Sequence, residues 1–467
     1  MTSLADVFKA YDIRGIVPDQ LNADQCRAIG AATARFIGRP RMLLARDMRE
    51  SGVELSYAFA EGARAEGVAV VDLGMASTDL LYFASGSLDA PGAMFTASHN
   101  PAQYNGIKLC MSGARPIGRD SGLAEIEAWA QELLDKWGSA GHPMVDPTSL
   151  APMEEQNLLD EYADHVRSFV DLDVLRPLRV VADTANGMGG LVAPKVFAPL
   201  PFQVEILFPE LDGNFPNHPA DPIQPENLTA LQAAIAASGA DIGLAFDGDA
   251  DRCFVVDEKG HPVSPSAVTA LVAARELHRE IGATVIYNLI TSRAVPELVV
   301  ERGGTPVRSR VGHSYIKALM ADTGAIFGGE HSAHYYFRDF WGADSGMLAA
   351  LHVLAALGEQ ERPLSDLMAD YQRYEASGEI NFTVTDAEAR VDAVLRSFGT
   401  RIHSIDHLDG VTVDLGDGSW LNLRMSNTEP LLRLNVEARS TAEVDEIVGH
   451  ISQIVQAEIA SGSGAAP

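Results

Sequence analysis

The stretch FTASHNPAQYNG, residues 95–106, places a serine hydroxyl beside an imidazole where an apolar run gives way to a polar loop. A serine hydrolase would show a Gly-x-Ser-x-Gly turn, and none surrounds Ser98. Acyl transfer is therefore disfavoured. If Ser98 instead carries a phosphoryl group, its oxygen can also bind a metal ion, with His99 beside it. A capped polar turn is the alternative for these two residues taken alone.

A second loop, LAFDGDADR, ends an apolar run with three alternating carboxylates, Asp247, Asp249 and Asp251, followed by Arg252. Carboxylates this close repel one another unless a hard cation neutralises them, and oxygen ligands favour Mg²⁺. A solvated acidic turn is the plain alternative. An EF-hand is excluded because its sixth position needs glycine and holds Arg252. An aspartyl-phosphate phosphotransferase of the haloacid dehalogenase type, with Asp247 as nucleophile, stays open but leaves Ser98 without a role.

A third loop, GEHSAH at 329–334, carries a carboxylate and a hydroxyl two residues apart. Glu330 and Ser332 alternate along it, and a carboxylate beside a hydroxyl suits two adjacent sugar hydroxyls. A glycine-rich segment, DTANGMGG at 183–190, lacks both the Rossmann spacing and a Walker lysine. We expect it to be a structural turn at a helix start.

The region near the C-terminus contains a compact group of phosphate donors. In LLRLNVEA, leucine and valine alternate with polar residues, so Arg433 should point away from the core. The predicted phosphate-binding set comprises Arg424, Ser426, Asn427, Thr428 and Arg433. A polar hairpin turn is the alternative. His313 and Lys317, one helical turn apart, are expected to add to this phosphate-facing surface.

Strand and helix patterns alternate through most of the chain, and open α/β sheets bind ligands beyond the carboxyl ends of their strands. The three α/β units differ in pattern from the last hundred residues, which read as alternating strands and a final helix. We therefore predict three tandem α/β domains with mixed sheets and a C-terminal α+β domain. The predicted boundaries are 1–147, 148–254, 255–370 and 371–467.

Composition narrows the function classes. The 467 residues carry a net charge of −29 without a long basic run, which disfavours binding to nucleic acid or to an anionic membrane. No stretch approaches the roughly 20 apolar residues of a membrane span, and the sequence predicts a cytoplasmic protein. The three cysteines have no metal-ligand spacing and are expected to be reduced, buried thiols.

Five segments in order resemble the signature loops of the α-D-phosphohexomutases: FKAYDIRG (8–15), TASHNP (96–101), DGDADR (247–252), GEHSAH (329–334) and RMSNTEPLLRLNVEAR (424–439). The likeness covers nearly the whole chain, and the first and last segments are similar to the phosphomannomutase/phosphoglucomutase branch. The resemblance implies domains arranged around a central active-site cleft. It also implies interconversion of hexose 6-phosphate and hexose 1-phosphate, of mannose and/or glucose, through a phosphoserine and a hexose 1,6-bisphosphate, which would also act as activator.

The same resemblance implies roles for individual residues. Ser98 would be the phosphocarrier, Mg²⁺ would be held by the phosphoserine oxygen and the three aspartates, and Arg252 would stabilise the charge. Acid–base work would fall to Lys108 and His334. The remaining implied contributors are Arg14 and His99 to catalysis, and Tyr11, Arg14 and His334 to substrate binding. Taken alone, Lys108 could be a solvated strand charge, His334 a core imidazole and Arg14 a surface ion pair.

The sugar-binding loop departs from the usual family pattern. The family usually has glycine where this chain has Ala333, and His331 occupies a variable position, so mannose, glucose or glucosamine phosphate could be preferred. A sugar-phosphate sensor would need the phosphate donors but neither Ser98 nor three metal carboxylates. The expected partners are small hexose phosphates, with the chain a monomer or a weak homo-oligomer. We also predict that the last domain is a mobile lid hinged near residues 368–379, because a bisphosphate must turn over without being lost.

Overall fold

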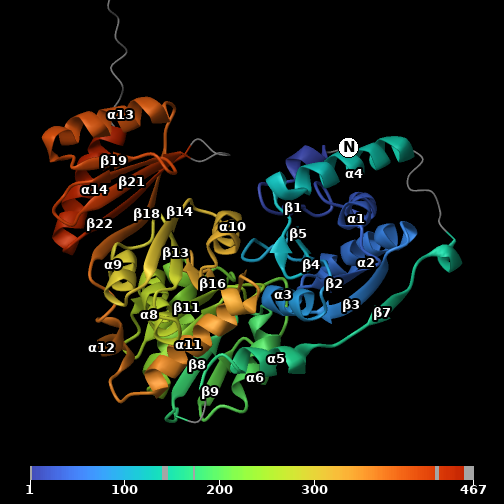
Figure 1. The fold of residues 1–467 in the computed structure, drawn as a ribbon, viewed down its shortest axis with the longest axis horizontal. Helices are drawn as coiled ribbons and strands as arrows, with labels where there is room; N and C mark the ends of the chain where they lie inside the picture. Colours follow the sequence, from blue (N-terminus) through green and yellow to red (C-terminus); the bar gives the residue numbers. More distant parts are fainter. Residues whose placement is uncertain (1–2, 139–145, 172–173, 426–430, 457–467) are drawn as a thin grey trace, which may run out of the picture.

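The computed structural model describes residues 3–138, 146–171, 174–425 and 431–456. They form four consecutive domains that follow one another around an arc (Figure 1). The first domain, in blue and teal, and the C-terminal domain, in red, lie at the two ends of this arc. Three α/β domains and one domain with an antiparallel sheet confirm the predicted fold class.

The first domain has a sheet in the order β1-β5-β4-β2-β3-β7, with β6 paired to β5. Its strands are β1 (Ile13–Ile16), β2 (Arg41–Arg46), β3 (Ala69–Met75), β4 (Gly92–Phe95), β5 (Tyr104–Met111), β6 (Arg115–Pro116) and β7 (Met153–Glu155). Its helices are α1 (Ala23–Ile37), α2 (Glu50–Ala65), α3 (Thr78–Ser87) and α4 (Leu123–Trp137). Local sequence sets the helix starts: Asn22 and Gln25 form a capping box at α1, and the Ser77 hydroxyl caps α3.

The second domain has a mixed sheet in the order β12-β11-β10-β8-β9. Its strands are β8 (Arg179–Asp183), β9 (Gln203–Leu207), β10 (Ile242–Phe246), β11 (Cys253–Asp257) and β12 (Pro262–Val263). Its helices are α5 (Leu159–Arg167), α6 (Gly189–Phe197) and α7 (Thr229–Ser238). The turn before α6 is the DTANGMGG segment, which therefore has the structural position expected of it.

The third domain has a sheet in the order β14-β13-β15-β16-β17. Its strands are β13 (Thr284–Asn288), β14 (Thr305–Ser309), β15 (Phe327–Gly329), β16 (Tyr335–Phe337) and β17 (Ala343–Asp344). Its helices are α8 (Pro265–Arg279), α9 (Ala294–Glu301), α10 (His313–Thr323), α11 (Gly346–Gly358) and α12 (Leu364–Met368).

The C-terminal domain has an antiparallel sheet in the order β18-β22-β21-β20-β19. Its strands are β18 (Glu375–Thr383), β19 (Ser404–Asp406), β20 (Val411–Asp414), β21 (Trp420–Met425) and β22 (Leu431–Ala438). Helices α13 (Ala387–Phe398) and α14 (Thr441–Gln456) pack together, with α14 against β18 and β22. Within the described ranges, no helix has the length and apolar character needed to cross a bilayer.

Two of the predicted domain boundaries fall inside sheets. β7 lies beyond residue 147 yet pairs with β3 of the first sheet, and residue 254 interrupts β11, whose sheet extends to Val263. β7 is a short exposed strand with no apolar alternation to mark it. β11 is the antiparallel return strand after the acidic loop, so that loop lies within a domain and not near its end.

Buried apolar residues join the first three domains and leave the fourth separate. One cluster runs through all three and includes Leu80, Val192 and Leu348. The C-terminal domain has a core of its own, formed by residues such as Leu434 and Ile451. The first three domains therefore share a hydrophobic core to which the described residues of the fourth domain do not contribute.

Candidate active site

Ser98 lies in the loop that follows β4 and meets the acidic loop of the second domain. The residue is only 6% exposed, and its Oγ donates a hydrogen bond to Asp247 Oδ2 at 2.7 Å. Arg252 Nη2 lies 3.3 Å from the same hydroxyl oxygen. Two loops separated by about 150 residues in the chain therefore meet at the serine oxygen.

The acidic loop connects β10 to β11 and buries all three carboxylates. One oxygen from each of Asp247, Asp249 and Asp251 lies within 4.8 Å of the others. Asp249 Oδ1 and Asp251 Oδ1 are buried without a hydrogen-bond partner, which is costly for a polar atom. An oxygen-only donor set with unsatisfied buried oxygens, next to the Ser98 hydroxyl, suits a hard divalent cation such as Mg²⁺. The residues present thus fit the predicted metal.

Lys108 on β5 is part of this cluster and is not a solvated strand charge. Its Nζ donates to Asp249 Oδ2 and to Asp251 Oδ2, both at 2.6 Å. Burial disfavours the ammonium form, but the two carboxylates outweigh it and hold the pKa of Lys108 well above its usual value. In this arrangement the two carboxylates hold Lys108 as an ammonium ion.

The pKa values of two of these carboxyl groups, Asp247 and Asp249, shift in opposite directions. Burial raises the pKa of Asp247 to about 8; Arg252 opposes this, and Asp251 and Asp249 add to it. Burial also works to raise the pKa of Asp249, but Lys108 and the hydrogen bonds it receives bring it below its usual range. Neighbouring carboxyl groups whose pKa values shift in opposite directions are typical of functional sites.

Arg252 and His99 both lie next to the Ser98 hydroxyl. Arg252 Nε donates to Asp247 Oδ2 at 2.9 Å, and Arg252 Nη2 lies 2.7 Å from His99 Nδ1. Burial, together with Arg252 and Arg14, lowers the pKa of His99 to about 3. The His99 ring is therefore neutral and accepts a hydrogen bond from Arg252, which orients the guanidinium.

A cavity of about 320 Å³ opens next to these groups, a volume within the range of small-molecule sites. It is lined by Lys9, Tyr11, Asp12, Arg14, Tyr82, Ser98, His99, Lys108, Asp251, Arg252, His334 and Asp344. Arg14 donates to Asn100 Oδ1 at 2.6 Å and pairs with Asp12, so it belongs to the cavity wall and not to a surface ion pair.

The GEHSAH loop contributes to the cavity through His334. His334 Nε2 lies 3.9 Å from Asp251 Oδ1, and its Nδ1 lies 3.1 Å from Ser332 Oγ. Glu330 is buried, and its oxygens accept bonds from Tyr336, Asn288 and the Gly312 amide. Ala333 has a φ of 65°, a left-handed conformation that favours glycine.

Lys317 and His313 lie on α10. Lys317 is only 7% exposed; its Nζ lies 2.6 Å from Asp344 Oδ1 and 4.3 Å from the centre of the Tyr82 ring. It thus reaches the wall of the active-site cavity, which Asp344 and Tyr82 line, through protein contacts. His313 is the first residue of the helix, and its side chain lies outside the described part of the structure.

The predicted phosphate donors of the C-terminal domain are described in part. Arg424 and Arg433 are directly opposite each other on β21 and β22, and both lie near Glu379, at 3.2 Å and 3.7 Å. Two guanidinium groups side by side form a basic pair that a phosphate could bridge. Ser426, Asn427 and Thr428 lie outside the described residues.

Sequence reasoning missed three polar groups at the site. Thr78 Oγ1 donates to Asp249 Oδ2 at 2.5 Å, and Asp344 borders the cavity. Arg49 donates to the main-chain carbonyl of Ser98 in the serine loop. Thr78 and Arg49 follow the carboxyl ends of β3 and β2, where ligand-binding side chains concentrate. Their position directly after a strand was therefore the sequence feature that could have identified Thr78 and Arg49.

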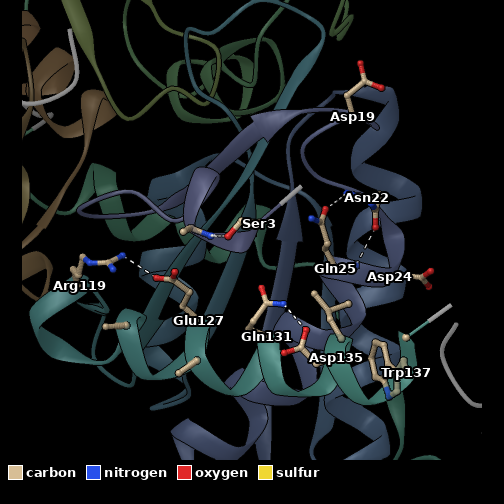
Figure 2. A pocket seen from close by; sticks show the side chains of 15 residues that line it. Ser3, Asp19, Asn22, Asp24, Gln25, Arg119, Glu127, Gln131, Asp135 and Trp137 are labelled. Carbon is tan, nitrogen blue, oxygen red and sulfur yellow. Dashed lines mark hydrogen bonds and ion pairs between the residues drawn. The ribbon is translucent and has the colours of Figure 1, made fainter. Parts of the chain in front are cut away.

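A larger cavity of about 820 Å³ lies elsewhere in the first domain, between the N-terminal segment, α1 and α4 (Figure 2). Polar groups of its lining bind one another: Arg119 donates to Glu127 and Gln131 to Asp135, both at 2.9 Å. The described site residues do not line it. Size alone therefore does not mark the active site.

Three α/β domains and a separate fourth, with a serine, a carboxylate cluster and basic side chains around one cavity, define a phosphoryl-transfer enzyme of the mutase class. Models of phosphoglucomutase/phosphomannomutase α/β/α domains I, II and III match residues 5–135, 160–260 and 265–374, and the C-terminal domain model matches 379–454. The chain belongs to the phosphoglucomutase/phosphomannomutase family, as its sequence motifs predicted.

Individual relatives agree over nearly the whole length. A protein of Xanthomonas campestris described as "Phosphohexose mutases" is 41% identical over 443 residues, 94% of this chain and 96% of that protein. A phosphomannomutase of Escherichia coli is 38% identical over 446 residues, again 94% and 96%. The crystal structure of a phosphoglucomutase/phosphomannomutase family protein from Burkholderia thailandensis has a TM-score of 0.85 and 33% identity, covering 97% of each chain.

Proposed function

We propose that this enzyme interconverts hexose 6-phosphate and hexose 1-phosphate, of mannose and/or glucose, through a phosphorylated Ser98 and a hexose 1,6-bisphosphate. The observation that carries the proposal is the Ser98 hydroxyl, which borders the cavity and lies 2.7 Å from a buried metal-type carboxylate cluster. The name phosphomannomutase, given to several relatives, supports mannose phosphate as one substrate. The cytoplasmic location stays a prediction from the sequence.

In the proposed reaction, the phosphoryl group on Ser98 passes to the free hydroxyl of a bound hexose monophosphate. The Ser98 O–P bond breaks, a sugar O–P bond forms, and the sugar hydroxyl loses its proton. The bisphosphate then turns over, and its other phosphoryl group returns to Ser98. This regenerates the phosphoenzyme and releases the isomeric monophosphate.

The chain's own groups are suited to these steps. Ser98 and the three aspartates would hold Mg²⁺, which when bound would neutralise charge on the transferring group. Arg252, kept in place by Asp247 and His99, is suited to stabilise the same charge. Lys108 and His334 both border the cavity, which supports their assignment as the proton donor to the leaving oxygen and the proton acceptor from the sugar hydroxyl.

Binding of the rest of the substrate is assigned to the third and fourth domains. His334 borders the cavity and Ser332 lies beside it, which supports a role for both at the sugar hydroxyls. Glu330 already accepts three protein hydrogen bonds and would have to exchange one. Arg424 and Arg433 would hold the phosphate that is not reacting. The separate core of the fourth domain supports the proposal that this domain is a lid, with the hinge near residues 368–379.

The haloacid dehalogenase-type alternative would make Asp247 the phosphate carrier. Asp247 is fully buried, is bound by Ser98 and Arg252, and is not among the residues that line the cavity, whereas Ser98 is. This geometry favours Ser98 as the group that reaches a substrate.

The proposal is tested by assaying turnover of mannose 1-phosphate and glucose 1-phosphate, separately, with Mg²⁺ and a hexose 1,6-bisphosphate activator. We expect formation of the 6-phosphate from at least one sugar, and loss of turnover by several orders of magnitude in Ser98→Ala. Binding of both sugars without turnover would contradict the proposal and point to a sensor. Turnover of glucosamine 1-phosphate alone would shift the substrate assignment.

A further inference from the structure

Arg49 is a buried cation that the reaction outlined above does not use. It lies just before α2, and its side chain is 1% exposed. A buried guanidinium is costly unless all its donors are satisfied. Its Nε donates to Asp47 Oδ2 at 3.2 Å, and the Asp47 carboxylate also accepts the Arg49 amide at 2.9 Å. The charge is thus paired, and the fork of the guanidinium is left for other acceptors.

The fork binds four main-chain carbonyls of the loop that carries Ser98. Nη2 donates to the carbonyl oxygens of Ser98 and Asn100, at 2.9 and 2.6 Å. Nη1 donates to those of Pro101 and Tyr104, at 2.8 and 3.0 Å. Four carbonyls that converge on one point form an acceptor pocket that a planar, five-donor cation fills. The path of the loop is therefore set around Arg49.

The conformation of Ser98 explains why such a support is needed. Its φ of 48° is in the left-handed region, which is unfavourable for a residue with a side chain. The Ser98 amide is fixed by Thr96 Oγ1 at 2.9 Å, and its carbonyl is fixed by Arg49. With both ends of the residue held, the Oγ points to Asp247.

Arg49 also contacts the domain that carries the acidic loop. Its guanidinium carbon lies 5.2 Å from the centre of the Phe215 ring. Gly213 packs so closely on the Arg49 backbone that a Cβ there would lie 2.7 Å from Arg49 Cα. One residue therefore contacts both the serine loop and the domain that carries the acidic loop.

We infer that Arg49 is a positioning residue for phosphoryl transfer, whose guanidinium shapes the serine loop so that Ser98 Oγ lies on the acidic loop. The inference rests on the proposed function, since it assigns Ser98 the transferred group. Arg49 does not line the cavity, and it binds Ser98 through the main-chain carbonyl and not through the hydroxyl, so it acts on the hydroxyl through the path of the loop.

The test compares Arg49→Lys and Arg49→Ala with wild type in the mutase assay. Lysine keeps the charge and much of the stem but cannot bind four carbonyls at once. We expect kcat to fall roughly 100-fold in both variants, the effect of an ångström-scale misplacement, with KM within about threefold of wild type. Guanidinium ion at millimolar concentration should restore part of the kcat of Arg49→Ala by occupying the vacated pocket.

The matched control is Arg167→Ala. Arg167 is another largely buried arginine that binds main-chain carbonyls, those of Lys195 and Val196 on α6 of the second domain. It should keep wild-type kcat and show no guanidinium response. Hydrogen exchange of residues 97–104, faster in the Arg49 variants only, reports the loop independently of turnover.

The outcomes separate the two proposals. Wild-type enzyme without mutase turnover would overturn the proposed function. Wild-type turnover combined with unchanged kcat in a folded Arg49→Lys enzyme, or with a kcat loss in Arg49→Ala that guanidinium does not relieve, would overturn the role of Arg49 alone. If Arg49→Ala does not fold, Arg49→Lys and the volume-conserving Asp47→Asn decide by the same kcat and exchange measurements.

Discussion

A methyl group at Gly248 tests how closely the serine loop and the acidic loop must pack. A Cβ on Gly248 would lie 2.4 Å from the carbonyl oxygen of Ser98, and ordinary contact begins near 3.4 Å. The difference, 3.4 − 2.4, requires the two loops to separate by about 1 Å. Displacement of this size between a reacting group and its partners costs roughly 100-fold in rate, or about 2.7 kcal/mol in activation free energy.

Gly248→Ala should therefore reduce kcat about 100-fold and lower the free energy of unfolding by roughly 1–3 kcal/mol through overpacking. Steady-state kinetics and urea unfolding measure the two effects. The control is Gly449→Ala on α14, where a Cβ has no neighbour within 4 Å and alanine should stabilise the helix by up to about 1 kcal/mol. A Gly248→Ala enzyme with kcat within about threefold of wild type would refute the close packing of the two loops.

Three further changes test separate parts of the account. Asp249→Asn removes one of three carboxylate charges and should raise the Mg²⁺ concentration for half-maximal activity about 10-fold or more; an unchanged Mg²⁺ titration would argue against the site. Arg433→Ala should raise KM and release more bisphosphate per turnover; the lid idea fails if hexose phosphate alters neither small-angle scattering nor hydrogen exchange of the fourth domain. Burial lowers the pKa of His352 from 6.5 to about 3, so the folded protein favours the neutral ring. The free energy of unfolding is therefore highest above about pH 6.5 and falls with the pH, by about 2 kcal/mol at pH 5. His352→Leu should reduce the drop in urea midpoint between pH 7 and pH 5, and an equal drop in both proteins would contradict this.

The functional loops at strand ends were predictable because each one is made of consecutive residues in the sequence. TASHNP and DGDADR each follow an apolar strand, β4 and β10, and the sheets bring their ends to one cavity. The alternation of strands and helices likewise predicted three α/β units and a different fourth one. Such features depend on local pattern, which a single sequence contains.

Features that depend on tertiary pairing were not predictable. Lys317 was expected on a phosphate-facing surface, but its side chain is buried and paired with Asp344, a residue 27 positions away on a different element. Arg49 has its role only because the loop after β4 folds back over it. The placement of β7 in the first sheet depends on pairing with β3, not on any apolar pattern of its own.

The central claim is that Ser98 carries the phosphoryl group, and locating the phosphate tests it most directly. The enzyme is incubated with hexose 1,6-bisphosphate, digested and mapped by mass spectrometry, with and without hydroxylamine. The account predicts a phosphate on Ser98 that resists hydroxylamine and disappears when hexose monophosphate is added, with formation of an equal amount of bisphosphate. A hydroxylamine-labile phosphate on Asp247, with Ser98 unmodified, would contradict it.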